Sequence, residues 1–415
     1  MLRPFLPCSI ALLVLLAAAC TGSAESGSAD SGLSYASTAD SAVSAPADSL
    51  GAGDATGAAP GSSDASGTGG LGSLQARQPA GGASASLLDS TAVVRALYVN
   101  RWAAQSRNRM RSLIAMADTT VVNAFVLDMK DEFGLNFAAE DSTLRRNAGD
   151  AGRVPRLGEL LDTLKAHDIV PIARIVVFKD SVAARLNPQE TIRTPDGSTW
   201  RDEKGVAWVS PYSGAVREYN IRVAEELVRL GFSEIQFDYV RFPEPYSRLA
   251  TQVFPGANGV SKPDAIAEFL EAARKRVNAL GVRSTADVFG LTTTVNGPLE
   301  VGQHWEKLAP YADVLLPMVY PSHYPPGSFN ISRPNADPYG IVKTAITRAR
   351  ERNEALGLGG ERVRAYLQAF SLGQPPYGAN EVAEQIRAVH DSGFNGWVLW
   401  HPGSRYDIFV EALLP

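Results

Sequence analysis

The sequence predicts a (β/α)8 TIM barrel preceded by a disordered N-terminal tether. Two observations support this α/β fold class. From about residue 94 onward, eight short β-rich runs alternate with helix-like stretches, which is the order typical of such barrels. Residues 21–86, by contrast, are mainly Ser, Ala, Gly and Asp with almost no aromatic side chains. Such a segment buries too little apolar surface to offset the entropy of ordering it.

The first 19 residues have the order of an export signal. Arg3 precedes the apolar run Ile10–Leu16, and three alanines lead to Cys20. The stretch LAAAC resembles a bacterial lipobox, which implies cleavage before Cys20 and a lipid on its sulfur. An ordinary secretory signal with a chance cysteine is the alternative. Because the only other cysteine, Cys8, leaves with the signal, lipidation also explains why Cys20 has no disulfide partner.

These features divide the chain into three parts. We expect a lipoprotein signal peptide at 1–19, a flexible linker at 20–87 and the folded domain at 88–415. The protein is then exported and attached to the membrane of the cell envelope through the lipid on Cys20. The chain is 45% hydrophobic and 20% charged, with a net charge of -5. This composition is ordinary for a globular protein and not basic enough for nucleic acid, and we expect a monomer.

The alternation of strands and helices can be followed along the chain. The β-rich runs are 96–100, 124–130, 171–178, 234–242, 284–290, 314–320, 363–370 and 396–402. Four of the helix-like stretches, with apolar residues three and four apart, are 217–231, 266–281, 338–357 and 380–393. An open doubly wound sheet is the main alternative. However, NRWAAQ follows the first strand, where that fold usually carries a glycine-rich phosphate loop.

The stretch EIQFDYVRFPEP (234–245) places a carboxylate inside a strand that is otherwise apolar and aromatic. Burying an unpaired charge costs several kcal/mol, so Asp238 needs a compensating environment. In barrel enzymes the C-terminal ends of the strands form the active site. Since side chains alternate along a strand, Asp238 and Gln236 face the lumen if Ile235 and Phe237 pack outward. Asp238 then lies at the mouth of the barrel.

Other strands place a polar or aromatic residue at the same rim: Asp128, Asp287, Tyr320, Gln368 and Trp400. Asp238 and Asp287 come from neighbouring strands, and we expect their carboxyl groups within about 5 to 10 Å of each other. Glycoside hydrolysis needs one protonated and one ionised carboxyl group, so these two are the candidate catalytic residues. The alternative is a structural ion pair of either aspartate with Arg241, Arg174 or Lys130.

The remaining rim residues are candidates for binding the substrate: Asp128, Arg241, Tyr320, His323, Gln368 and Trp400. Trp102 and Tyr324 also follow strands and can stack on sugar rings. Metal chemistry has little support, because His304, His323 and His401 are scattered without ligand spacing. A serine triad lacks its usual Gly-x-Ser-x-Gly elbow. We therefore expect neither a metal nor another cofactor.

Four separated motifs also resemble a known family. FDYVRFP, VGQHWEKLAPYADVLLPMVYPSHY (301–324), VRAYLQAF and GWVLWHP together resemble a bacterial family of glycosyl hydrolase domains of unknown function, related to the amylase-like TIM barrels. The resemblance covers roughly residues 94–412. It implies a barrel, a carbohydrate substrate and Asp238 at the position of the amylase-type nucleophile. The amylase pattern has a glutamate on the fifth strand, where this chain offers Asp287.

The leading hypothesis is a glycoside hydrolase that acts on a polysaccharide at the cell envelope. The competing hypothesis is a non-catalytic glycan-binding lipoprotein on a retained barrel. The second carboxyl group separates the two, because an enzyme needs it and a binding protein does not.

Overall fold

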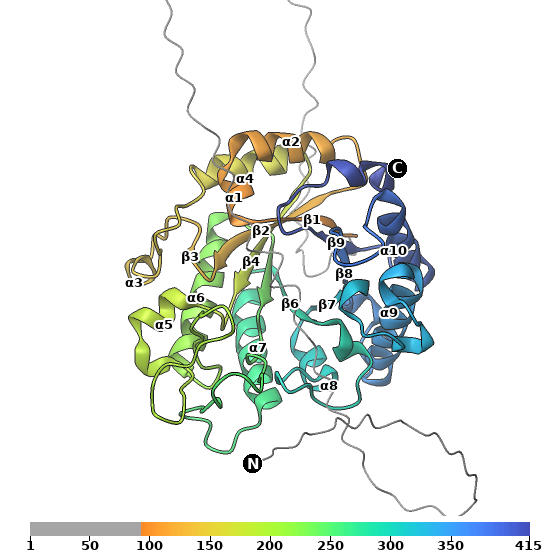
Figure 1. Ribbon diagram of the computed structural model, residues 1–415. Helices are drawn as coiled ribbons and strands as arrows, with labels where there is room; N and C mark the ends of the chain where they lie inside the picture. The colour runs from red at the N-terminus through yellow and green to blue at the C-terminus, as the bar shows by residue number, and fades with distance from the viewer. Residues whose placement is uncertain (1–92) are drawn as a thin grey trace, which may run out of the picture. The chain divides into compact units, whose positions relative to one another are not determined.

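The computed structural model describes residues 93–415 (Figure 1). The predicted signal peptide, the linker and the lipidation site at Cys20 lie outside the described residues. Within them, no helix has the length and the apolar character needed to cross a membrane.

Eight parallel strands form a closed barrel, as predicted. Each strand pairs with the next along the chain, and β1 pairs with both β2 and β9, which closes the sheet. A further two-residue strand, β3, pairs antiparallel with the end of β2. The strands are β1 (Arg95–Val99), β2 (Ala124–Asp131), β3 (Gly134–Leu135), β4 (Val170–Val176), β5 (Glu234–Asp238), β6 (Arg283–Phe289), β7 (Val314–Val319), β8 (Ala365–Gln368) and β9 (Trp397–Trp400).

Helices surround the barrel on its outside (Figure 1). They are α1 (Arg101–Gln105), α2 (Arg107–Ala117), α3 (Ser142–Arg145), α4 (Leu157–Ala166), α5 (Ser181–Leu186), α6 (Gly214–Leu230), α7 (Lys262–Asn278), α8 (Trp305–Leu308), α9 (Pro338–Ala355) and α10 (Ala379–Asp391). The four helices expected from periodicity are confirmed as α6, α7, α9 and α10. On α6, for example, the Ser213 side chain accepts a hydrogen bond from the Val216 amide, and Gly231 ends the helix with φ 110°.

Side chains alternate across the barrel wall as predicted on β5. Phe237 points outward, where its ring contacts Phe269 of α7 with centroids 5.3 Å apart. Gln236 points inward, and its amide donates a hydrogen bond of 3.1 Å to the Tyr366 hydroxyl of β8 across the lumen. The inward positions of the other strands are mostly apolar and form the core of the barrel. Asp238, one further inward position along β5, therefore lies above this core.

An ion pair closes the opposite end of the lumen. Arg364 donates hydrogen bonds of 2.6 and 3.1 Å to the two carboxylate oxygens of Glu234 at the start of β5, and both side chains are buried. A bidentate pair of this kind satisfies both charges without water. This ion pair thus occupies the N-terminal end of the lumen, and Asp238 lies at the C-terminal end.

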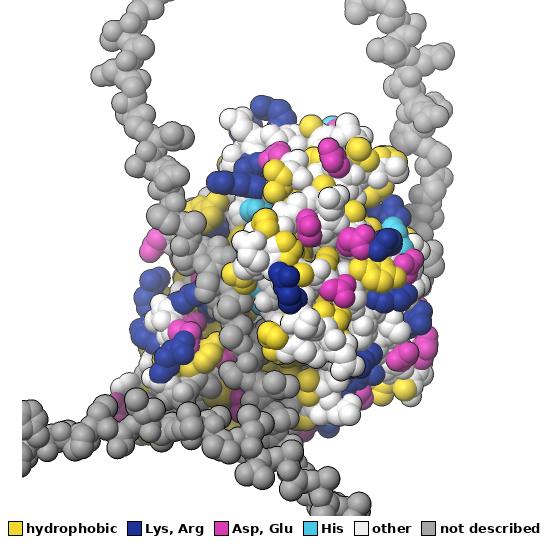
Figure 2. Space-filling view, turned by 45° about the vertical axis from the view of Figure 1, so that its right-hand side comes forward, with side chains coloured by type: hydrophobic (Ala, Val, Ile, Leu, Met, Phe, Trp, Pro, Cys, Tyr) yellow, Lys and Arg dark blue, Asp and Glu magenta, His cyan; other side chains and the backbone are white. Residues whose placement is uncertain are grey.

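The surface gives no sign of one dominant charge. On the face shown in Figure 2, basic and acidic side chains are interspersed. This arrangement differs from the basic stripe that proteins use to follow a phosphate backbone.

Candidate active site

A pocket of about 320 Å³ opens at the C-terminal ends of the strands. Most residues predicted from the sequence line it: Asp128, Asp238, Arg241, Asp287, Tyr320 and Trp400. They come from β2, β5, β6, β7 and β9 and from the segments that follow these strands. The structure therefore brings together side chains that are far apart in the chain.

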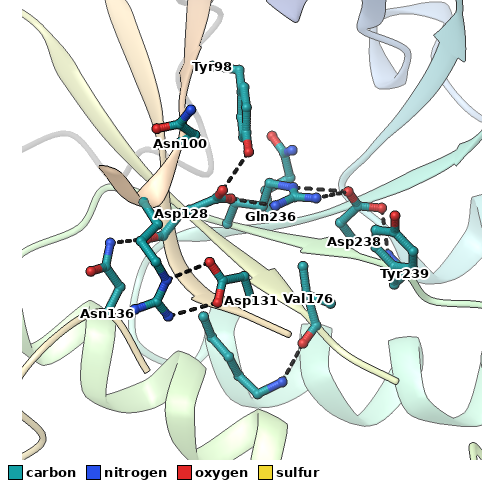
Figure 3. A network of polar contacts seen from close by, with 12 residues as sticks. Tyr98, Asn100, Asp128, Asp131, Asn136, Val176, Gln236, Asp238 and Tyr239 are labelled. Carbon is teal, nitrogen blue, oxygen red and sulfur yellow. Dashed lines mark hydrogen bonds and ion pairs between the residues drawn. The ribbon is translucent and has the colours of Figure 1, made fainter. Parts of the chain in front are cut away.

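Asp238 is the last residue of β5 and accepts three hydrogen bonds. Arg174 of β4 donates from Nε at 2.9 Å and from Nη2 at 2.5 Å to Oδ2, and the amide of Tyr239 donates to Oδ1 at 2.5 Å (Figure 3). Hydrogen bonds from a guanidinium and from a backbone amide suit an ionised carboxylate. Asp238 thus has the compensating environment that its place in an apolar strand requires.

The residue after Asp238 has an unusual backbone conformation. Tyr239 has φ 51°, in the left-handed region that residues other than glycine rarely adopt. Conformations of this kind cost of order 1–3 kcal/mol and gather at functional sites. Here the turn ends β5 and points the Tyr239 amide back at the Asp238 carboxylate.

Asp287 of β6 lies beside Asp238 and is buried. Burial and the neighbouring Asp238 carboxylate raise the pKa of Asp287 well above its usual range. Its Oδ2 accepts a hydrogen bond of 2.9 Å from the Gln236 amide, whereas Oδ1 has no donor. A proton on Asp287 would remove the repulsion between the two neighbouring carboxylates, which is one cause of the raised pKa. Asp287 therefore has the properties of the protonated partner.

The pairing of β5 with β6 places the two carboxyl groups side by side, as predicted for neighbouring strands. Phe237 pairs with Ala286, so the next residues of both strands, Asp238 and Asp287, lie at the same level. Two inward side chains at one level of neighbouring strands converge in the lumen.

Arg174, not Arg241, is the cation that pairs with Asp238. Its guanidinium also donates to Asp128 of β2, so it lies between two carboxylates. Arg241 instead pairs with Glu244 at 2.8 Å and lies over the Phe289 ring at 4.7 Å. The predicted alternative of an ion pair between an aspartate and Arg174 is thus present at Asp238. Arg241 still lines the pocket.

The other predicted ion-pair partner, Lys130, does not take part in the ion pairs of Arg174 with Asp128 and Asp238. Its ammonium group is 2.8 Å from Asp180. Asp128 itself accepts a hydrogen bond from the Tyr98 hydroxyl of β1 (Figure 3). Burial raises the pKa of Asp128, and Arg174 opposes that shift.

Aromatic rings form one wall of the pocket. Trp400 of β9 stacks on Tyr320 with centroids 5.8 Å apart and an interplanar angle of 27°. The Tyr98 ring also lies near Trp400, with centroids 5.9 Å apart. Flat apolar faces next to carboxyl groups suit a ligand with both polar and apolar faces, such as a sugar ring.

Two predicted binding residues lie away from the pocket. The Gln368 side chain is buried, accepts a hydrogen bond of 2.8 Å from the Ser322 hydroxyl and donates one of 2.9 Å to the Phe370 carbonyl. His323 contacts the same hydroxyl through Nδ1 at 2.9 Å, and burial lowers its pKa to about 4. Both side chains support the segment after β7 and are not among those that line the pocket.

Sequence reasoning missed several residues of the pocket, notably Tyr98, Glu132 and Lys179. Glu132 directly follows β2, so the rule that sites lie at the C-terminal ends of strands could have identified it. Burial and the adjacent Asp131 raise the pKa of Glu132. Lys179 lies 5.1 Å from the centroid of the Tyr239 ring, a contact that no sequence pattern reveals. Within residues 93–415 no His, Cys, Asp and Glu side chains are grouped so as to hold a metal ion.

Comparison with known proteins gives one family. Residues 96–406 match the model of a family described as "putative glycosyl hydrolase domain". No curated protein matches the sequence.

Several solved structures align with this chain. A hypothetical protein from Ruminiclostridium thermocellum is 33% identical and aligns over 46% of this chain and 97% of its own, with a TM-score of 0.42. The glycoside hydrolase domain of PgaB (BpsB) from Bordetella bronchiseptica is 14% identical and aligns over 78% of this chain and 98% of its own, with a TM-score of 0.56. An alpha-L-fucosidase from Paenibacillus thiaminolyticus is also 14% identical and aligns over 78% of this chain and 48% of its own, with a TM-score of 0.50. At 14% identity, the last two show the fold alone.

Proposed function

This chain belongs to the glycosyl hydrolase domain family, and we propose from this premise how it acts as a glycoside hydrolase. In this proposal it cleaves O-glycosidic bonds of a polysaccharide with Asp238 and Asp287. The observation that carries this proposal is a pair of neighbouring carboxyl groups in different surroundings: Asp287 is buried with a raised pKa, and Asp238 is bound to Arg174. Both line a pocket with an aromatic wall.

The chemistry follows from the different surroundings of the two groups. Asp287 gives its proton to the glycosidic oxygen as the C1–O bond breaks, and the Asp238 carboxylate stabilises the positive charge that develops at C1. Water then adds to C1, and its proton returns to the carboxyl pair. When the substrate binds, its glycosidic oxygen accepts the Asp287 proton. Arg174 keeps Asp238 in place during this exchange.

The proposal predicts a specific pH dependence. Because burial raises the pKa of Asp287, the group stays protonated over a wider pH range, and hydrolysis should fall as the pH rises through that raised pKa.

Asp287→Asn should lower kcat by about 10²-fold or more, because an amide cannot donate a proton to the leaving group. The measurement is the release of reducing ends from soluble starch, hydroxyethyl cellulose, xylan and glycol chitin between pH 4 and pH 10. Binding without release from any of them would favour the glycan-binding alternative.

We also propose that the enzyme acts at the cell envelope, attached through a lipid on Cys20. The export signal and the sequence LAAAC support this location. Cys20→Ala should release the protein from the membrane fraction or leave the signal uncleaved, because a stable anchor of this type needs its acyl chains. Cell fractionation with immunoblotting tests it. If the variant stays in the membrane fraction at its mature size, the protein is held there by something other than this lipid.

A further inference from the structure

Two large aromatic side chains are exposed at the edge of the pocket. The Trp102 side chain of α1 is 56% exposed, and that of Phe133, in the turn between β2 and β3, is 45% exposed. Their ring centroids are 6.3 Å apart with an interplanar angle of 49°, and both line the pocket that holds Asp238. Exposed aromatic surface next to a binding pocket points to a ligand that covers it.

The two segments are held together by a buried ion pair. Arg101 donates from Nε and from Nη2 to the two oxygens of Asp131, each at 2.7 Å, and both side chains are buried. The same Nη2 donates to the Gly134 carbonyl at 2.6 Å, and Asp131 Oδ1 accepts from the Phe133 amide at 2.9 Å. Arg101, the residue next to Trp102, is thus hydrogen-bonded to Asp131 and Gly134, which lie before and after Phe133 in the chain. Desolvating two charges is costly, and here the pair fixes where the two aromatic rings lie.

The neighbouring backbone is also fixed. Gly134 has φ 96°, and a Cβ there would lie 2.6 Å from the Asn147 carbonyl oxygen, so the turn is pressed against that segment. On the other side, Asn100 caps α1 through the Ala103 amide and donates to the Pro402 carbonyl at 2.7 Å. Neither segment needs to be ordered when a ligand arrives, which lowers the entropic cost of binding.

We propose that Trp102 and Phe133 form an outer subsite that stacks on a sugar ring of a polysaccharide chain whose cleaved bond lies at Asp238. This inference rests on the proposed function and narrows its substrate class to chains that extend from the pocket over its rim. The occupant is argued from continuity, since the same pocket runs from the two exposed rings to Trp400 and the carboxyl pair. A sugar ring has an apolar C–H face that fits an aromatic surface, while its hydroxyl groups stay in water.

The test is affinity electrophoresis of the protein in gels that contain glycol chitin, hydroxyethyl cellulose, xylan or soluble starch. The parent should be retarded in at least one gel, and Trp102→Ala should raise the dissociation constant there about tenfold, which corresponds to about 1.4 kcal/mol. Trp102→Phe should keep most of the retardation, because it keeps a flat apolar ring. Phe133→Ala should weaken binding in the same gel. Ile408→Ala is the matched control, since Ile408 is 67% exposed and does not line the pocket; it should migrate like the parent.

Equal retardation of parent and Trp102→Ala, or a parent that no gel retards, overturns the inference. Thermal denaturation of each variant shows that the comparison is between folded proteins. Failure of the proposed function is a separate result: a protein that is retarded through Trp102 but releases no reducing ends is a polysaccharide-binding protein with this subsite and not an enzyme.

Discussion

Asp238→Asn is expected to lower kcat by about 10³-fold or more while the protein keeps its fold. Asparagine has the size of aspartate, and its carbonyl oxygen can still accept the hydrogen bonds from Arg174. It lacks the negative charge that stabilises the developing charge at C1. The measurement is kcat on the polysaccharide that the panel identifies, together with thermal denaturation.

Asp313→Asn is the matched control for this variant. Asp313 also accepts a hydrogen bond from an arginine, Arg274, at 2.7 Å, but it precedes β7 and lies at the end of the barrel opposite the pocket. The control should lower stability without changing kcat. An Asp238→Asn protein with the kcat of the parent would show that the carboxylate has no part in the reaction.

Arg174→Met is expected to destabilise the protein by about 3–5 kcal/mol. The guanidinium is buried between Asp128 and Asp238, and its removal leaves two buried carboxylates without a cation. Methionine occupies much of the same volume, so the loss reflects charge more than packing. Urea denaturation at neutral pH measures the free energy of unfolding.

The effect should depend on pH in a defined direction. Burial already raises the pKa of Asp128, and Arg174 opposes this shift, so Asp128 of the variant should take up a proton at higher pH than in the parent. The destabilisation should therefore be greatest at neutral pH and shrink as the pH falls. Adding Asp128→Asn and Asp238→Asn to Arg174→Met should restore part of the stability, because no unpaired charge is left. A single Arg174→Met variant as stable as the parent would contradict the proposed ion-pair network.

The barrel could be predicted because its signals are local. Each strand was visible as a short β-rich run, and helices such as α6 were visible as apolar residues three and four apart. The alternation of side chains along β5 was enough to predict that Asp238 faces the lumen and that Phe237 points outward. The rule for the C-terminal ends of strands then selected Asp238 and Asp287 for the pocket that the structure shows.

The pairing of charges could not be predicted, because it depends on contacts between distant segments. Arg241 is three residues from Asp238, yet the left-handed turn at Tyr239 directs it to Glu244, and Arg174, 64 residues away, takes its place. Gln368 has the sequence position of a rim residue, but hydrogen bonds of the segment after β7 hold its side chain elsewhere.

The sequence by itself thus determined the order of strands and helices and the directions in which the β5 side chains point, because both follow from short-range periodicity. Only the tertiary structure decided which carboxyl group has the raised pKa, since the shift of Asp287 comes from burial and from a carboxylate on another strand. The tertiary structure also decided that the exposed rings of Trp102 and Phe133 lie side by side. Their two segments are joined by the buried Arg101, a contact that no spacing in the chain reveals.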